Sequence, residues 1–228
     1  MESIPDIPCI GGVAFDLDGT LFNTEIVYDV VCEKLLERRG HKVRPDVISQ
    51  MMGRPSHIAL QILINEHGFD DTVEALQTES HDLFLELING RAELMPGAME
   101  MIDHVQSLGL PISITTSSDP KLVTPLLDLA NITSKFEFLL TAADVKNHKP
   151  HPEIYLTAAK KFGIQPAELL AFEDSQVGCA AAVASGAYTI VVPSKLKDQH
   201  DFSGASLIAD SLKSPEIRRL VDLGTRGQ

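Results

Sequence analysis

The stretch GVAFDLDGT, residues 12–20, decides how the rest of the chain is interpreted. Its short apolar run predicts a buried strand from Ile10 to Phe15. The strand is followed by two carboxylates, Asp16 and Asp18, and by Gly19, which permits a sharp turn. In open parallel sheets, ligands bind beyond the carboxyl ends of the strands. We therefore expect Asp16 and Asp18 at the mouth of a site, with an ordinary acidic turn as the alternative.

Composition limits the class of protein and of partner. A chain of 228 residues buries roughly 70–75% of the surface that it exposes when unfolded, which is enough for one domain or for a domain with an insert. The net charge of -13 argues against binding nucleic acid or an anionic membrane, so an anionic substrate needs local cations. No stretch approaches the ~18 uninterrupted apolar residues of a membrane span, and the N-terminus lacks the basic region of a signal peptide. Three cysteines without metal-like spacing indicate reduced thiols. We expect a cytoplasmic protein that is a monomer or a weak homodimer.

The hydrophobic pattern after Thr20 divides the chain into two parts. Helical spacing and glycine stops predict consecutive helices over residues 23–39, 45–52, 56–67 and 70–89. From about residue 96, predicted helices alternate with predicted strands, which cover residues 111–116, 136–140, 169–172 and 188–192. The tail after Lys213 is polar, and we expect it to fray.

This alternation predicts an α/β fold with a doubly wound parallel sheet and right-handed crossovers. The first strand must join that sheet, so the core is discontinuous. We expect residues 1–22 and 93–228 to form a Rossmann-like core. Residues 23–92 are then a small α-helical bundle, or cap, inserted as a second domain. Hinges are expected near residues 20–25 and 90–96.

Polar side chains follow four of the predicted strands. In chain order they are Asp16 and Asp18, then Thr116, Ser117 and Ser118, then Lys149, then Glu173, Asp174 and Ser175. Hydroxyl groups before a helix N-terminus and an ammonium group suit a phosphate, and clustered carboxylates suit Mg²⁺. Each group alone has an ordinary explanation as a helix cap, a solvated lysine or an acidic helix start. Their common position at strand ends favours one site.

This ordered set resembles the motifs of the haloacid dehalogenase superfamily over nearly the whole chain. Residues 16–20 match the first motif, Thr116 the second, Lys149 the third, and the pair Glu173 and Asp174 the fourth. The run FEDSQVG, residues 172–178, and the helical cap are similar to the β-phosphoglucomutase-like branch.

A shorter resemblance links residues 23–31 and 52–54 to the pseudouridine-5'-phosphatase and glycerol-phosphate phosphatase group. Asn23 departs from the aspartate that is usual there. This departure leaves the exact substrate open.

The superfamily resemblance implies a mechanism. Asp16 would attack phosphorus and become an aspartyl phosphate, and Asp18 would act as general acid and then as general base. Thr116, the N–H group of Ser117 and Lys149 would hold the phosphoryl oxygens. Mg²⁺ would be held by four residues, with Glu173 bound directly or one shell further out. These are the carboxylate of Asp16, the backbone carbonyl of Asp18, and Glu173 and Asp174.

The same resemblance narrows the reaction. Dehalogenase members lack an acid at the position of Asp18, and transport ATPases have threonine there, so a phosphatase or a phosphomutase is implied. Tyr28 takes the place of a histidine of β-phosphoglucomutase, and the arginine that grips the second phosphate in that enzyme has no clear counterpart. Hydrolysis of a small phosphate ester is therefore favoured over a β-phosphoglucomutase-type phosphomutase. The four intact motifs argue against a third possibility, a non-catalytic binding protein.

Three residues of the cap are candidates for contact with the substrate. Glu25 and Tyr28 lie in the first predicted helix, where packing or solvation explains them equally well. Arg54 follows Gly53, and a glycine turn can aim its side chain at the core.

Replacing Arg54 tests its role in substrate choice. We expect Arg54→Ala to lower kcat/KM on preferred metabolites by about tenfold, the effect of losing one charge-assisted hydrogen bond, and to change activity on a small aryl phosphate much less. A panel of phosphorylated sugars, nucleotides and polyols provides the measurement. An equal loss on every substrate would instead assign Arg54 to the chemical step or to the fold.

Overall fold

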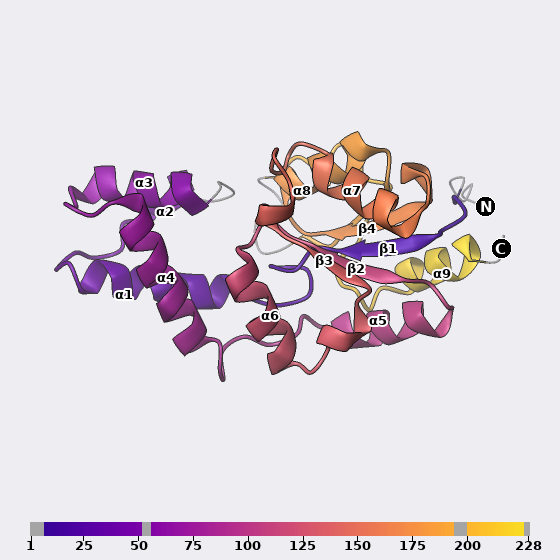
Figure 1. Ribbon diagram of the computed structural model, residues 1–228, viewed down its shortest axis with the longest axis horizontal. Helices are drawn as coiled ribbons and strands as arrows, with labels where there is room; N and C mark the ends of the chain where they lie inside the picture. The colour runs from indigo at the N-terminus through magenta and orange to yellow at the C-terminus, as the bar shows by residue number, and fades with distance from the viewer. Residues whose placement is uncertain (1–6, 52–55, 194–199, 226–228) are drawn as a thin grey trace.

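The computed structural model describes residues 7–51, 56–193 and 200–225, and it has a parallel sheet at its centre (Figure 1). The strands are β1 Gly12–Phe15, β2 Ile112–Thr115, β3 Phe138–Leu140, β4 Leu169–Glu173, β5 Tyr188–Val191 and β6 Leu207–Ile208. Their order in the sheet is β3-β2-β1-β4-β5-β6, and every pairing is parallel. The chain therefore places β2 and β3 in turn on one side of β1, and then β4, β5 and β6 on the other side. A ligand site is expected at this switch point, beyond the carboxyl ends of β1 and β4.

Helices cover both faces of the sheet. Figure 1 shows α7 and α8 above it and α5 and α9 below it. The helices of this part of the chain are α5 Ala98–Ser107, α6 Pro120–Leu129, α7 Glu153–Phe162, α8 Gln176–Ser185 and α9 Pro215–Gly224. Three short 3₁₀ turns accompany them, Thr133–Lys135, Ala142–Asp144 and Pro166–Glu168. The prediction of a doubly wound α/β fold is confirmed.

The central strands are buried on both faces, as expected for a sheet between two layers of helices. Every residue of β1, β2 and β4 is buried. The rings of Phe15 and Phe172 stack at a centroid distance of 4.8 Å with an interplanar angle of 5°. Gly12 leaves room for α7, because a Cβ there would lie 2.8 Å from the ring of Phe162. The strands that lead to the site are thus rigidly held.

Four helices form a separate group beside the sheet, at the left of Figure 1. They are α1 Glu25–Glu37, α2 Pro45–Met51, α3 Ser56–His67 and α4 Val73–Leu87. Within the group, α1 packs on α4, α2 on α3 and α3 on α4, and α4 also touches α6. These contacts support a bundle inserted after β1. We propose residues 23–92 as its extent.

The chain enters and leaves this bundle along two segments that run side by side. The N–H group of Asn23 donates to the carbonyl of Glu93 (3.1 Å), and that of Met95 donates to the carbonyl of Leu21 (2.8 Å). The N–H group of Glu93 also donates to the side-chain oxygen of Asn23 (2.7 Å). The two predicted hinges are therefore joined to each other.

The end of the chain differs from expectation. The polar tail after Lys213 was expected to fray, and this was wrong, because α9 forms and buries Ile217, Leu220 and Val221 in the main core. These few apolar residues recur at helical spacing among charged ones, so the pattern is short and easily missed. The strand β6 was also missed, since two residues are too few to show a period.

The helices and strands begin and end a few residues away from the bounds that the sequence predicts. Ile10 does not belong to β1, and its N–H group instead donates to the carbonyl of Gly224 at the end of α9 (3.0 Å). The fourth helix begins at Val73 because the side chain of Thr72 caps it, accepting from the N–H group of Ala75 at 3.2 Å.

Among the described residues, no helix combines the length and the apolar character needed to cross a membrane.

Candidate active site

Three neighbouring strands at the centre of the sheet bring the predicted motif residues together. Asp16 follows β1, Thr116 follows β2, and Glu173 ends β4. The backbone pairing continues past the strands, because the N–H group of Asp16 donates to the carbonyl of Phe172 at 2.9 Å. The side chains after β1, β2 and β4 therefore share one edge of the sheet.

Three carboxylates form a buried cluster at this edge. Asp16, Glu173 and Asp174 each offer an oxygen that lies within 4.8 Å of those of the other two. Burial raises the pKa of Asp16 to about 8, with additions from the charges of Glu173 and Asp18 and opposition from Lys149. Burial also raises the pKa of Asp174 well above its usual value, and Asp16 adds to this effect. A hard divalent cation fits this set of oxygens, because it relieves the repulsion that the acids exert on one another.

One ammonium group lies inside the acidic cluster. Lys149 Nζ donates to Asp16 Oδ1 (2.7 Å), to Glu173 Oε1 (2.6 Å) and to the carbonyl of Thr115 (3.0 Å). Three donor protons thus have three acceptors. Burial acts to lower the pKa of Lys149, but Asp16 and Glu173 outweigh it and hold the pKa well above its usual value. The site therefore contains a fixed positive charge.

Asp18 is held by hydroxyl groups. Its Oδ1 accepts from Thr24 Oγ1 at 2.7 Å, and its Oδ2 accepts from Ser118 Oγ and from Thr116 Oγ1, the latter at 3.3 Å. Thr116 Oγ1 in turn accepts from the N–H group of Ser118 at 3.0 Å. Asp18 thus connects the loop after β2 with the start of α1.

The helix α1 brings two candidate substrate contacts to the same region. Burial raises the pKa of Tyr28, and the charge of Asp18 adds to this effect. The Tyr28 ring also packs on Phe84 at a centroid distance of 4.7 Å. Glu25 is exposed, and its charge contributes to the raised pKa of Asp174. Both side chains therefore lie near the acids.

The sequence also predicted Ser117 and Arg54 as contacts. Ser117 is exposed in the loop after β2. Arg54 lies outside the described residues.

The sequence interpretation did not single out three residues that contact the site. Thr24 has the look of a helix cap, yet its side chain makes no capping hydrogen bond and binds Asp18 instead. Ser118 was part of a recognised hydroxyl cluster but had no assigned partner. Tyr155 donates its hydroxyl to Glu173 Oε1, and its place on the buried face of α7 resembles any core position.

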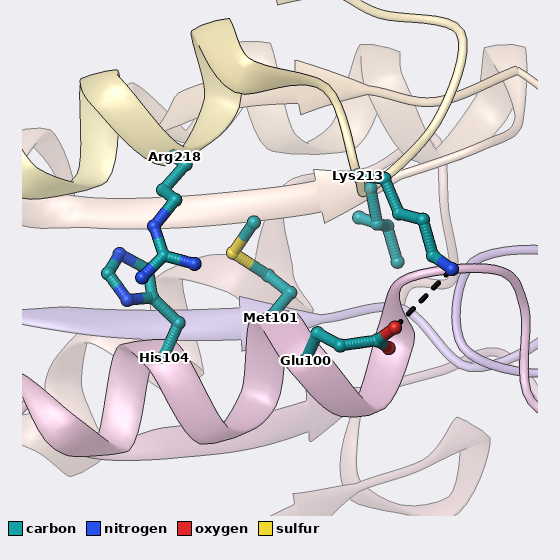
Figure 2. Close-up of a pocket in the computed structure, with 6 residues that line it drawn as sticks. Glu100, Met101, His104, Lys213 and Arg218 are labelled. Carbon is teal, nitrogen blue, oxygen red and sulfur yellow. Dashed lines mark ion pairs between the residues drawn. The ribbon is translucent and has the colours of Figure 1, made fainter.

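A pocket elsewhere in the molecule contains none of the predicted site residues. It has a volume of about 250 Å³, and Leu212 is one of the residues that line it. Figure 2 shows the other lining residues, Glu100, Met101, His104, Lys213 and Arg218, on α5, on α9 and on the segment before α9. Its charges are partly paired, with Lys213 Nζ 3.4 Å from Glu100 and His104 Nε2 2.9 Å from Asp222. The edge of the sheet, and not this pocket, is the candidate active site.

Comparison with known proteins agrees with this geometry. Residues 13–192 match the family described as haloacid dehalogenase-like hydrolase, and the chain belongs to this family. It is 33% identical over 216 residues to (DL)-glycerol-3-phosphatase 2 of Arabidopsis thaliana, covering 88% of this chain and 86% of that protein. It is 29% identical over 204 residues to the Drosophila melanogaster protein named "Probable pseudouridine-5'-phosphatase", covering 87% and 88%.

A solved structure has the same fold. CbbY from Rhodobacter sphaeroides in complex with phosphate superposes with a TM-score of 0.80 at 22% identity, covering 89% of this chain and 95% of that one. At this level of identity the likeness bears on the fold alone.

The raised pKa of Asp16 predicts that cation binding depends on pH. Below pH 8 the metal-free carboxyl group holds a proton, which a divalent cation must displace. We expect the apparent affinity for Mg²⁺ to rise between pH 6 and pH 8, by up to about tenfold per pH unit, and then to level off. Calorimetric titrations in two buffers of different ionisation enthalpy measure the affinity and the released proton together. A constant affinity without proton release would show that the acids are already ionised.

Two glycines with nearly the same positive φ allow a matched test of Asp174. A Cβ at Gly19 (φ +79°) would lie 2.1 Å from Asp174 Oδ2, whereas one at Gly90 (φ +77°) would have nothing within 4 Å. Gly19→Ala and Gly90→Ala should each lose about 1–2 kcal/mol of unfolding free energy through left-handed backbone strain. Only Gly19→Ala should also weaken Mg²⁺ binding, by about tenfold or more, because it displaces Asp174. Urea unfolding and Mg²⁺ titration are the measurements, and equal Mg²⁺ affinity in the two variants would contradict the placement of Asp174.

Proposed function

We propose that the protein is a Mg²⁺-dependent phosphatase that hydrolyses a small phosphorylated metabolite through an aspartyl-phosphate intermediate. One observation carries the proposal: the buried carboxylate of Asp16 accepts a hydrogen bond from the Lys149 ammonium group and lies close to Glu173 and Asp174 at the end of β4. A carboxylate in this setting can serve as a nucleophile toward phosphorus. The names of the two phosphatase relatives support the reaction class.

The donor set supports Mg²⁺ as the cofactor. Asp16, Glu173 and Asp174 supply the carboxylates, and we assign the backbone carbonyl of Asp18 as a further ligand. When bound, Mg²⁺ neutralises charge on the phosphoryl oxygens and favours the ionised form of the acids. Asp16 must be ionised to attack, and its metal-free pKa of about 8 explains why the reaction at neutral pH needs the cation.

The two chemical steps use Asp16 and Asp18 in turn. An oxygen of Asp16 forms a bond to phosphorus while the bond from phosphorus to the ester oxygen breaks, and Asp18 donates a proton to that leaving oxygen. In the second step Asp18 takes a proton from a water molecule, which attacks phosphorus and releases phosphate from Asp16. The hydroxyl groups of Thr24 and Ser118 orient Asp18 for both transfers.

Fixed donors stabilise the phosphoryl group during transfer. Lys149 carries the positive charge, while Thr116 and the N–H group of Ser117 lie in the loop after β2. Negative charge spreads over the equatorial oxygens in the transition state, so donors fixed in advance lower its energy.

We assign the choice of substrate to the helical bundle. Tyr28 and Glu25 approach the site from α1, and Arg54 remains a predicted contact. The protein's charge of -13 fits a small phosphate ester better than nucleic acid or a membrane surface. We extend the proposal to a cytoplasmic monomer or weak homodimer.

Three assays on the purified protein separate this function from its alternatives. Release of p-nitrophenol from its phosphate ester, with and without EDTA, tests for metal-dependent hydrolysis. Glucose-1-phosphate separates a phosphatase, which releases free phosphate, from a phosphomutase, which forms glucose-6-phosphate. A panel of phosphorylated sugars, nucleotides and polyols then identifies the substrate. Activity that resists EDTA would reject the role of Mg²⁺.

The nucleophile has a direct test. Asp16→Asn should reduce hydrolysis of p-nitrophenyl phosphate by about 10³-fold or more, because an amide oxygen is a poor nucleophile. Asp82→Asn makes the same chemical change on the exposed surface of α4 and should keep full activity. Steady-state rates of both variants provide the comparison. Activity retained in Asp16→Asn would remove Asp16 from this role.

A further inference from the structure

The helix α7 places a buried hydroxyl group among the acids. Tyr155 lies at the start of α7 with none of its surface exposed, and its hydroxyl donates to Glu173 Oε1. A phenol hydroxyl that is removed from water and placed against a carboxylate acts as its hydrogen-bond donor.

The carboxylate of Glu173 is held from both sides. Its Oε1 accepts from Tyr155 and also from Lys149 Nζ at 2.6 Å. Its Oε2 accepts from Ser175 Oγ at 3.3 Å and faces α8 where Gly178 leaves space, because a Cβ there would lie 1.9 Å from this oxygen. Glu173 cannot turn without losing the bond to Tyr155 or meeting the backbone of α8.

Lys149 depends on Glu173 for its position. Of the three acceptors of Lys149 Nζ, the carbonyl of Thr115 is fixed by the backbone, and Asp16 is the group that reacts in the proposed mechanism. Glu173 is then the side-chain acceptor that keeps its place throughout the reaction. Lys149 Nζ also lies 5.2 Å from the centre of the Tyr155 ring, which adds a cation–π contact.

We propose that Tyr155 is a positioning residue for this site. Its hydroxyl fixes Glu173 Oε1, and Glu173 in turn holds Lys149 where its charge meets a phosphoryl group. Glu173 would then act mainly as the partner of Lys149, besides being one of the acids that could hold a cation. The effect on turnover rests on the proposed phosphatase function, whereas the effect on phosphate binding does not.

A second tyrosine, which is itself half-buried but has a buried hydroxyl group, provides the matched control. Within the described residues, the hydroxyl group of Tyr188 is buried without a hydrogen-bond partner. Tyr155→Phe and Tyr188→Phe each remove one buried oxygen, but only the first removes a hydrogen bond to Glu173. We expect Tyr155→Phe to weaken binding of inorganic phosphate in the presence of Mg²⁺ by about tenfold, and to lower kcat on p-nitrophenyl phosphate by a similar factor. The Mg²⁺ concentration that gives half-maximal activity should change by less than about twofold. Tyr188→Phe should leave the phosphate affinity, kcat and this Mg²⁺ concentration near their wild-type values.

A double-mutant cycle tests whether Tyr155 acts through Glu173. In a Glu173→Gln background, Tyr155→Phe should change phosphate affinity by less than about twofold, because the group it positions is already altered. A merely structural role for Tyr155 would give the full loss in both backgrounds. Calorimetry gives the affinities, and circular dichroism confirms that each variant is folded.

The result remains decisive if Tyr155→Phe does not fold. Gly178→Ala pushes on the same carboxylate from the opposite side and should give a similar loss of phosphate affinity. Wild-type phosphate affinity in Tyr155→Phe, or in Gly178→Ala if the first variant is unfolded, would overturn the inference. A wild-type protein that binds phosphate but hydrolyses no ester would reject the proposed function alone, and the affinities would still decide the role of Tyr155.

Discussion

The structure depends on one buried ion-pair network, in which Lys149 bridges Asp16 and Glu173 at the centre of the sheet. Charged groups are costly to remove from water unless they are paired and hydrogen-bonded. Here each proton of the ammonium group has an acceptor, and one acceptor is the backbone of β2. Three strands and the segment before α7 must meet in register for these atoms to touch. Three features hold the strands in this register. They are the order of the strands in the sheet, the stacking of Phe15 on Phe172, and the close approach of α7 to Gly12.

The carboxylates of this network carry more negative charge than Lys149 can neutralise. Three clustered carboxylates lie beside a single ammonium group. Burial and the negative charge of the neighbouring acids raise the pKa values of Asp16 and Asp174. The imbalance favours a divalent cation over an apolar ligand. With a divalent cation bound, the site would offer a phosphate ester the local positive charge that it needs when it approaches a chain of charge -13. Asp18 is not one of these three acids, and it accepts hydrogen bonds from the hydroxyl groups of Thr24 and Ser118.

Much of this arrangement could be predicted from the sequence, for a physical reason. Parallel strands end at a common edge, so residues that follow them in sequence, such as Asp16, Thr116 and Glu173, meet in space. Side chains whose neighbours come from distant parts of the chain could not be predicted in this way. Tyr155 resembles a core residue and Thr24 resembles a helix cap, and only the tertiary contacts show that their hydroxyl groups bind acids. The helix α9 was missed because its stability comes from packing on the core and not from a long apolar pattern.

The bond between Ile10 and Gly224 has a consequence for folding during synthesis. The segment before β1 is bonded to α9, and the two neighbours of β1 in the sheet come from residues 112–115 and 169–173. β1 is therefore synthesised well before the strands that pair with it. Contacts so distant in sequence slow the search for the native state and leave an apolar segment uncovered on the nascent chain. Until those strands have been made, β1 offers an apolar segment of the kind that molecular chaperones bind.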